Sequence, residues 1–192
     1  MLLTLLASIT ASRAEPAFID PRDGQHYRVV AIGGQRWMAE NLRFAEPGSV
    51  CFDDKAENCA ELGRLYDYDT AARSYPPDWR LPSDPDWIRL ERSLGASAEE
   101  AAKERHRALG IGAKLKAGGD TGFDALLAGY LDPHEKAFQH KGRTSAFWAS
   151  TLDRADDVSA LAWHRDVDVR RTGIYRSKVN VTYKLPVRCV TG

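Results

Sequence analysis

The sequence has no surplus of charge of either sign. Lysine plus arginine and aspartate plus glutamate each total 27 of its 192 residues. Proteins held on nucleic acid or on anionic lipid by electrostatic attraction carry a basic surplus, so we expect neither as a partner. Apolar residues make up 43% of the chain, which is enough for one globular domain with its own core.

Long apolar runs are also missing, so no segment of the sequence is suited to crossing a bilayer. The apolar run over residues 2–9 is short and leads into Ser12-Arg13-Ala14. This pattern is typical of a secretory signal peptide, although it lacks the basic residues that open such peptides, and a buried N-terminal strand or helix is the alternative. We expect cleavage after Ala14, which leaves residues 15–192 as one soluble, secreted or periplasmic domain without membrane insertion.

Motifs of the common enzyme classes are absent. There is no HExxH zinc motif, nucleophile elbow, P-loop or dinucleotide fingerprint. His134 and His140 could meet across a loop, but their spacing does not place both rings on one face of a helix. Asp153, Asp156 and Asp157 could hold an adventitious ion, although a hydrated loop is the simpler interpretation. We therefore expect no catalytic residue, no metal and no cofactor.

Cysteine is scarce, and the 3 present form an odd number. Cys51 and Cys59 flank a short polar loop, so a disulfide between them would close readily in an oxidising compartment. We expect this disulfide, with a stabilisation of about 2.5 kcal/mol from loop entropy. A metal or redox pair is the alternative, but CxxC spacing and a nearby histidine are missing. Cys189 is left over.

Helical signals lie in the first half of the domain. Ser83 suits the N-cap of a helix, because apolar residues then recur at three- and four-residue spacing. Ser97 and Glu100 form a capping-box pattern before Gly110, which suits a helix end. The sequence thus predicts helices over residues 70–74, 83–94 and 98–109.

Strand signals dominate the second half. From residue 111 onward glycine recurs and helical periodicity disappears, while short alternating segments are separated by turn residues. Helices early and antiparallel strands late favour an α+β fold over a βαβ repeat. The predicted strands cover residues 24–32, 35–38, 123–131, 145–151, 160–170, 174–181 and 186–190.

Several short motifs follow one another in order along the chain. They are Asp20-Pro-Arg-Asp-Gly-Gln-His-Tyr27, Ile32-Gly-Gly-Gln-Arg-Trp-Met-Ala-Glu-Asn-Leu42, Gly63-Arg-Leu-Tyr66, Pro76-Pro-Asp-Trp-Arg-Leu-Pro-Ser-Asp-Pro-Asp-Trp87, Gly112-Ala-Lys-Leu-Lys116, Gly122-Phe-Asp-Ala-Leu-Leu-Ala-Gly-Tyr130, Phe147-Trp-Ala-Ser-Thr151 and Val187-Arg-Cys-Val190. Together they resemble the Fibrobacter succinogenes major paralogous domain, or FISUMP, family over essentially the whole mature chain. The resemblance implies an exported bacterial domain of the C-type-lectin-like fold. In that fold two helices flank antiparallel sheets, the chain termini pair as strands, and a long loop region carries the binding.

The resemblance also bears on Cys189. The family typically has a cysteine where Tyr75 stands, and that cysteine would bridge to the one in the Val-Arg-Cys motif. The resemblance therefore implies that Cys189 is a free thiol, buried as a small apolar residue. An intermolecular disulfide that gives a covalent dimer is the alternative to the monomer that we expect.

Five tryptophans invite a carbohydrate-binding interpretation, because sugars stack on aromatic faces. Core packing better explains the four that lie inside the family motifs, namely Trp37, Trp79, Trp87 and Trp148. Trp163, Tyr130 and Tyr175 are the more suitable platforms for a sugar. The Glu-Pro-Asn, Gln-Pro-Asp and Trp-Asn-Asp sequences of calcium-dependent lectins are absent.

Arginines cluster between residues 165 and 178. They could form a basic face suited to an anionic glycan, with Arg165, Arg170 and Arg171 as candidate contacts. Cross-strand charge pairing on a solvent-facing sheet is the more ordinary role, and we favour it.

The sequence as a whole therefore predicts an exported binding or interaction module for a glycan or an envelope protein, without catalysis. An envelope enzyme acting on glycans or thiols is the alternative, because the formylglycine-generating enzymes share a related fold and use reactive cysteines.

Overall fold

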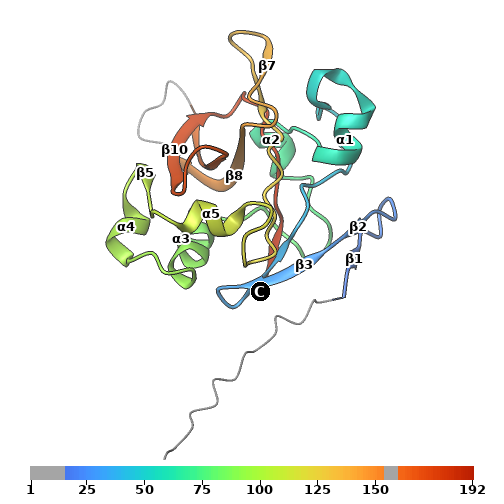
Figure 1. The fold of residues 1–192 in the computed structure, drawn as a ribbon. Coiled ribbons are helices and arrows are strands. Elements are labelled where there is room, and N and C mark those ends of the chain that lie inside the picture. Colours follow the sequence, from blue (N-terminus) through green and yellow to red (C-terminus); the bar gives the residue numbers. More distant parts are fainter. Residues whose placement is uncertain (1–15, 154–159) are drawn as a thin grey trace, which may run out of the picture.

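Four antiparallel strands form the largest sheet, in the spatial order β5–β10–β9–β8 (Figure 1). Its long strands are β8 (Thr144–Asp153), β9 (Leu161–Asp168) and β10 (Ile174–Asn180), and β5 (Arg105–Arg107) is a short edge strand. The strands predicted over 145–151, 160–170 and 174–181 are thus confirmed.

The structure is a computed structural model that describes residues 16–153 and 160–192. The predicted signal peptide, its cleavage site after Ala14, and the aspartates Asp156 and Asp157 lie outside these described residues.

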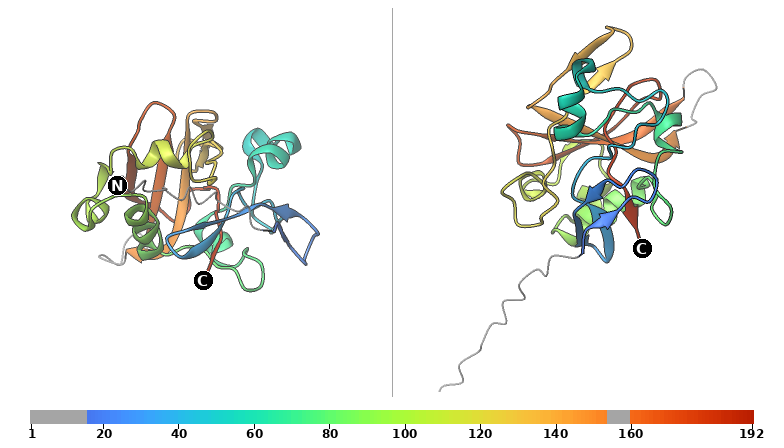
Figure 2. Two further views of the ribbon diagram at one scale, coloured as in Figure 1. Left: turned by 60° about the horizontal axis from the view of Figure 1, so that its bottom comes forward. Right: turned by 90° about the vertical axis from the view of Figure 1, so that its right-hand side faces the viewer.

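The C-terminal strand joins a hairpin from the first part of the described domain in a second sheet. Strand β4 (Gln35–Met38) lies between β3 (Val29–Ile32) and the C-terminal β11 (Val190–Thr191) (Figure 2). Gly33 and Gly34 join β3 to β4 with φ values of 63° and 75°, the left-handed values that a two-residue hairpin turn needs. The predicted hairpin is confirmed. Of the segment predicted to be a strand over 186–190, only its last residue belongs to β11.

Two further antiparallel pairs are small. They are β1 (Phe18–Ile19) with β2 (His26–Tyr27), and β6 (Tyr130–Asp132) with β7 (Ala137–Gln139). The strand predicted over 123–131 is wrong for most of its length. Phe123 is instead buried between aromatic rings, and Gly129 has φ 68° at a point where any Cβ would lie 2.2 Å from the Gln139 carbonyl oxygen. Tertiary packing therefore determines the conformation of this segment, and the alternation of apolar and polar residues in its sequence does not.

Five short α-helices occur in the described residues, rather than the two that the resemblance implied. They are α1 (Ala56–Leu62), α2 (Tyr68–Ala71), α3 (Asp84–Ser93), α4 (Ala98–Ala102) and α5 (Ile111–Leu115). The short helix predicted near residues 70–74 corresponds to α2, and α5 was not predicted. A 3-10 turn (Phe52–Asp54) precedes α1. In the part of the chain described here, none of the helices has both the length and the apolar character that a membrane span requires.

Helix α3 begins as predicted. The Ser83 side chain accepts a hydrogen bond from the Asp86 N–H, and the Asp86 carboxylate accepts one from the Ser83 N–H, which completes a capping box. Trp87 and Leu90 are fully buried on its inner face. This helix is therefore fixed both by its cap and by the core.

The helix predicted over 98–109 is wrong beyond Ala102. The backbone turns to an extended conformation at Lys103, and residues 105–107 pair with β10 as strand β5. The predicted helix had no apolar stripe to hold it against the core. The strand instead lets Arg107 reach a buried partner, Glu91 of α3, at 2.5 Å.

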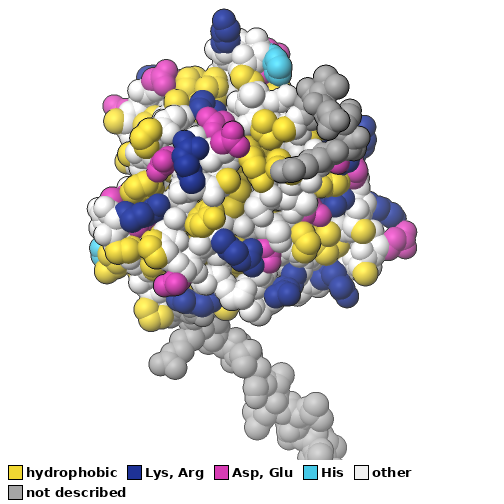
Figure 3. All heavy atoms as spheres, turned by 180° about the vertical axis from the view of Figure 1, so that it is seen from behind, with side chains coloured by type: hydrophobic (Ala, Val, Ile, Leu, Met, Phe, Trp, Pro, Cys, Tyr) yellow, Lys and Arg dark blue, Asp and Glu magenta, His cyan; other side chains and the backbone are white. Residues whose placement is uncertain are grey.

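The four-stranded sheet lies between two apolar clusters. On one face Phe147, Val167 and Ile174 pack with residues of α3 and α5. On the other face Trp148 and Ala162 pack with side chains that include Tyr66, Leu185 and Val187. All four motif tryptophans are buried as predicted. On the side of the molecule shown in Figure 3, basic and acidic side chains are interspersed among apolar ones.

Candidate functional site

A cleft lies between one face of the four-stranded sheet and the wall formed by Tyr130 and Tyr183. It consists of two recesses that share Tyr130, Asp166 and Tyr175. Their volumes, about 240 Å³ and about 350 Å³, lie near the lower end for small-molecule sites. The first recess is lined by Tyr130, Ala146, His164, Asp166, Tyr175, Ser177, Lys178, Val179, Tyr183 and Leu185. The second recess is lined by His106, Tyr130, His140, Arg143, Thr144, Asp166, Asp168, Arg171 and Tyr175.

Strand register decides which side chains reach this cleft. Side chains alternate along β9, so His164 and Asp166 line the cleft while Arg165 points to the other face, towards α3. On β10, Ser177 lies directly opposite His164, and Tyr175 lies directly opposite Asp166. Two neighbouring strands thus present four polar side chains as a compact group.

His164 and Asp166 form the most unusual pair in the cleft. His164 Nε2 lies 3.3 Å from Asp166 Oδ1, yet both this oxygen and His164 Nδ1 are buried without a hydrogen-bond partner. Unpartnered buried polar atoms cost free energy and therefore mark this pair as unusual, although neither atom has surface that a ligand could reach. The Asp166 side chain is 24% exposed, and since Oδ1 is buried, Oδ2 is the oxygen open to the recess.

Burial shifts the two pKa values of this pair in opposite directions. Burial, followed by the charge of Arg165, lowers the pKa of His164 to about 3. Burial, followed by the charge of Asp168, raises the pKa of Asp166 to about 7. His164 is therefore neutral at pH 7, and Asp166 keeps its proton to a much higher pH than an exposed aspartate does. Such shifts, together with a cleft, are typical of functional sites.

The wall opposite the sheet is aromatic. The Tyr130 ring stands edge-on to His140, with ring centroids 5.3 Å apart, and its centroid lies 6.1 Å from that of Tyr183. The Tyr183 hydroxyl donates a hydrogen bond to Asp132 at 2.8 Å, which fixes the ring. On the sheet side, Tyr175 packs against His106 with centroids 4.8 Å apart. Aromatic rings therefore stand on both sides of the cleft.

The second recess is ionic at its outer end. Asp168 accepts hydrogen bonds from the Arg170 N–H at 2.7 Å and from the Thr144 hydroxyl at 3.1 Å, and Arg143 Nε lies 3.7 Å from it. Burial, followed by the charge of Arg171, lowers the pKa of His106. Arg171 therefore lies close enough to act electrostatically on the aromatic part of the recess.

Arg165 lies in a buried ionic cluster, which we define as Asp84, Glu91, Arg107, Arg165 and Arg176. Its guanidinium lies 2.7 Å from both carboxylates. Arg176 pairs with Asp84 at 2.8 Å, and Arg107 pairs with Glu91. The favoured cross-strand pairing on a solvent-facing sheet is wrong for Arg165 and Arg176, because their partners belong to α3 and the group is buried.

The other candidate residues are divided between the cleft and its surroundings. Tyr130, Tyr175 and Arg171 line the second recess. Trp163 lies on the opposite face of β9, with the Arg176 guanidinium 3.7 Å from its ring centroid. Arg170 is exposed in the turn after β9 and is not among the lining residues.

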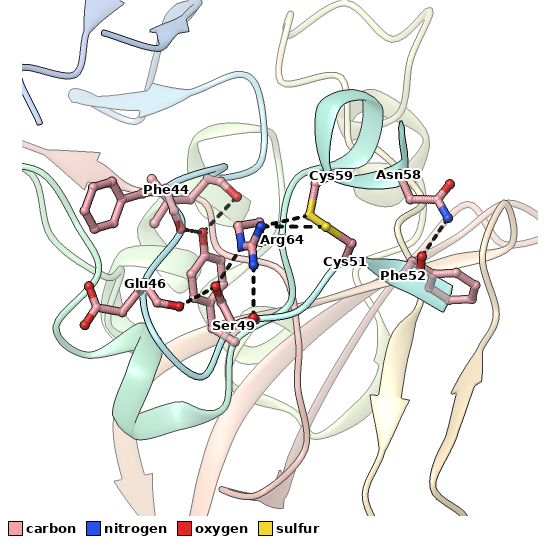
Figure 4. The surroundings of a disulfide bond; sticks show 10 residues. Phe44, Glu46, Ser49, Cys51, Phe52, Asn58, Cys59 and Arg64 are labelled. Atoms are coloured by element: carbon pink, nitrogen blue, oxygen red, sulfur yellow. Dashed lines mark hydrogen bonds between the residues drawn. A yellow bond between two sulfur atoms is a disulfide. The ribbon is translucent and has the colours of Figure 1, made fainter. Parts of the chain in front are cut away.

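The predicted disulfide between Cys51 and Cys59 is present (Figure 4). The Arg64 guanidinium points at both sulfur atoms, 3.4 Å from Cys59 Sγ and 3.7 Å from Cys51 Sγ. Asn58 of α1 donates a hydrogen bond to the Phe52 carbonyl oxygen at 2.7 Å. The bridge thus holds α1 against the preceding 3-10 turn.

Cys189 is a free thiol with no exposed surface. It belongs to the apolar cluster that contains Trp148 and Val187. Burial raises its pKa well above the usual range of a thiol, so it does not form a thiolate at neutral pH. A nucleophilic role of Cys189 has no support in this environment.

Sequence reasoning missed His164, Asp166, Ser177 and Tyr183. The sequence does contain a signal for His164 and Asp166, because these two residues alternate with Arg165 and Val167 along a predicted strand and therefore share one of its faces. This alternation shows that the two faces of the strand differ, but it does not show which face lines an open recess. In the described residues, no group of three or more histidine, cysteine, aspartate or glutamate side chains is arranged to hold a metal ion.

Comparison with known proteins gives one match. The model of the Fibrobacter succinogenes major domain matches residues 30–191. No curated protein and no solved structure matches the chain.

Proposed function

Because the chain belongs to the Fibrobacter succinogenes major domain family, we propose that it is an exported binding module whose cleft holds a carbohydrate. The observation that carries the proposal is the cleft itself, in which tyrosine rings stand beside the polar side chains of Asp166 and Ser177.

A carbohydrate fits this chemistry better than an apolar ligand does. A sugar ring has C–H faces that pack on aromatic rings and a rim of hydroxyl groups that donate and accept hydrogen bonds. Tyr130, Tyr175 and Tyr183 supply the rings. The partly exposed Asp166 carboxyl group and the Ser177 hydroxyl line the same recess. Mixed apolar and polar walls of this kind give both affinity and orientation.

Two further assignments belong to the same proposal. We place the domain in the C-type-lectin-like fold, supported by the pairing of β11 with the N-terminal β4. We place the protein outside the cytosol, supported by the disulfide and by the signal-like start of the sequence.

Titration calorimetry with a panel of oligosaccharides tests the binding function. We expect Tyr175→Ala to weaken binding about tenfold through loss of the ring face, and Tyr175→Phe to retain most of it. Tyr75→Ala is the matched control, because Tyr75 is exposed and does not line the cleft. Equal affinities of the Tyr175→Ala and Tyr75→Ala variants would show that the cleft is not the binding site.

A glycan-cleaving enzyme is the second candidate, favoured by the opposite pKa shifts of His164 and Asp166. Carboxyl groups that stay protonated near neutral pH serve as general acids in glycoside hydrolysis. Release of reducing sugar that disappears in the Asp166→Asn variant would establish this function. Thiol chemistry is not supported, because the only free cysteine is buried.

A further inference from the structure

The cations near the cleft differ in whether they already have an acidic partner. Arg165 and Arg176 pair with carboxylates of the buried ionic cluster. Lys178 Nζ lies 2.9 Å from Asp153 Oδ2 and 3.4 Å from Glu104. Carboxylates therefore already compensate the positive charges of these three side chains.

Arg171 differs from them. It lines the second recess, and among residues 16–153 and 160–192 no carboxylate lies within ion-pair distance of its guanidinium. Asp168, the nearest acidic residue in sequence, is already engaged by the Arg170 N–H, the Thr144 hydroxyl and Arg143. The charge of Arg171 helps to lower the pKa of Asp168 from beyond ion-pair distance, so its guanidinium makes no direct ionic contact in the described residues and can still contact an anion.

Asp166 does not cancel this positive charge fully. Its Oδ1 is buried beside neutral His164, and Asp168 stands two residues along the same face of β9. Both surroundings favour the protonated carboxyl, whose O–H donates a hydrogen bond. The second recess then offers an unpaired guanidinium, the imidazoles of His106 and His140, and a carboxyl O–H, so most of its free groups are hydrogen-bond donors.

We propose that the second recess is a subsite for an anionic group, a carboxylate or a sulfate, carried by an acidic glycan, and that Arg171 is its cationic contact. This inference rests on the proposed carbohydrate-binding function and names the ligand class. The sugar ring packs on Tyr175 and Tyr130, which line both recesses, while its anionic group reaches Arg171. An acceptor-rich ligand thereby meets a donor-rich wall.

The subsite also makes binding depend on pH. Protonation of Asp166 removes a negative charge from the recess, so affinity for an anion rises as pH falls from 8 to 6. Several other titratable or charged groups line the recesses around Asp166 and act on the same equilibrium. They are His164 and Asp168 of β9, Tyr175 and Lys178 of β10, His106 of β5, Tyr130 of β6, Tyr183 of the segment after β10, Arg143 and His140.

Calorimetry with three probes tests the inference: an oligogalacturonate for the carboxylate, a chondroitin sulfate oligosaccharide for the sulfate, and a neutral cello-oligosaccharide. We expect at least one acidic probe to bind about tenfold more tightly than the neutral one at pH 6. Arg171→Ala should lower affinity for the acidic probe about tenfold more than affinity for the neutral probe. Arg170→Ala is the matched control, because it removes the adjacent exposed arginine that does not line the recess.

The outcomes separate the inference from the function on which it rests. Tight neutral binding with no acidic preference overturns the anionic subsite but leaves a carbohydrate site. Equal loss in the Arg170→Ala and Arg171→Ala variants overturns it as well, because the effect is then general electrostatics. Absence of binding to all three probes overturns both proposals. A pH dependence as large in the Asp166→Asn variant as in the wild type contradicts the role given to that carboxyl.

Discussion

Two residues of β9, His164 and Asp166, show how burial sets protonation. Neither carries a hydrogen bond that would compensate a charge at its buried atoms, so each favours its neutral form. For a histidine this lowers the pKa and for an aspartate it raises it. The consequences for stability have opposite signs.

The Asp166→Asn variant isolates the effect of the aspartate on stability. The raised pKa means that the wild-type protein loses stability as pH rises from about 4, where the unfolded carboxyl ionises, through about 7. The variant has no such loss. We expect it to be about 1 to 3 kcal/mol more stable than wild type at pH 8 and equally stable at pH 4, measured by urea unfolding.

Asp168→Asn is the matched control for that experiment. Its pKa is lowered on balance, because hydrogen bonds from the Arg170 N–H and the Thr144 hydroxyl outweigh the effect of burial, which comes first among the causes. Its stabilisation is present at pH 8 and is lost as pH falls through its folded pKa, so the Asp168→Asn variant should be less stable than wild type at pH 8. If both variants were less stable than the wild type at pH 8, ionisation of Asp166 would not destabilise the folded protein, and the account of its pKa would be wrong.

The three cysteines give a prediction that can be counted. Native protein should react with no equivalents of a thiol reagent, because Cys189 is buried and Cys51 is bonded to Cys59. Unfolding without reductant should expose one thiol, and unfolding with reductant should expose three. A disulfide-linked dimer on a non-reducing gel, or a peptide that joins Cys189 to Cys51 or Cys59, contradicts this assignment.

Among the elements, α3 is held to the sheet by charge as well as by apolar packing. The buried ionic cluster places two carboxylates of α3 among three guanidiniums of β5, β9 and β10. Pairs of this kind contribute little compared with apolar packing, but removal of one partner leaves uncompensated charge in a medium of low dielectric. The cluster therefore fixes how α3 docks.

Glu91→Gln tests this arrangement. Glu91 has no exposed surface and pairs with both Arg107 and Arg165. We expect the variant to lose about 3 to 5 kcal/mol of unfolding free energy, measured by urea unfolding. Glu99→Gln is the control, because Glu99 and its partner Lys103 are both exposed and the substitution should leave the unfolding midpoint essentially unchanged. Equally small effects of the two substitutions on the free energy of unfolding would mean that solvent screens the charges of the cluster.

The elements also show how far local sequence signals reach. Helix α3 was predictable because its capping box and apolar face act within one segment. Residues 103–109 were not, because their conformation depends on pairing with β10 and on Glu91 across the core. The same holds for Phe123, which tertiary packing removes from the predicted strand.

For the whole molecule, the sequence located the aromatic and basic residues but not the cleft that unites some of them. Tyr130 and Tyr175 were candidates because of their residue type, and the fold brings both to the same recess. Arg165 and Arg171 looked alike in the sequence, yet one faces α3 and the other lines the second recess. Which face of a strand is open depends on what packs on the other side, and a single sequence does not contain that information.

Backbone NMR of the ¹⁵N-labelled protein, titrated with an oligogalacturonate and a chondroitin sulfate oligosaccharide at pH 6, tests the central claim that this cleft is the ligand site. The account predicts that shift changes gather at the cleft, in residues 130, 140, 164–166, 171, 175–178 and 183. Changes that gather on α3 and α4 instead, or saturable binding with no change in the cleft, would contradict it.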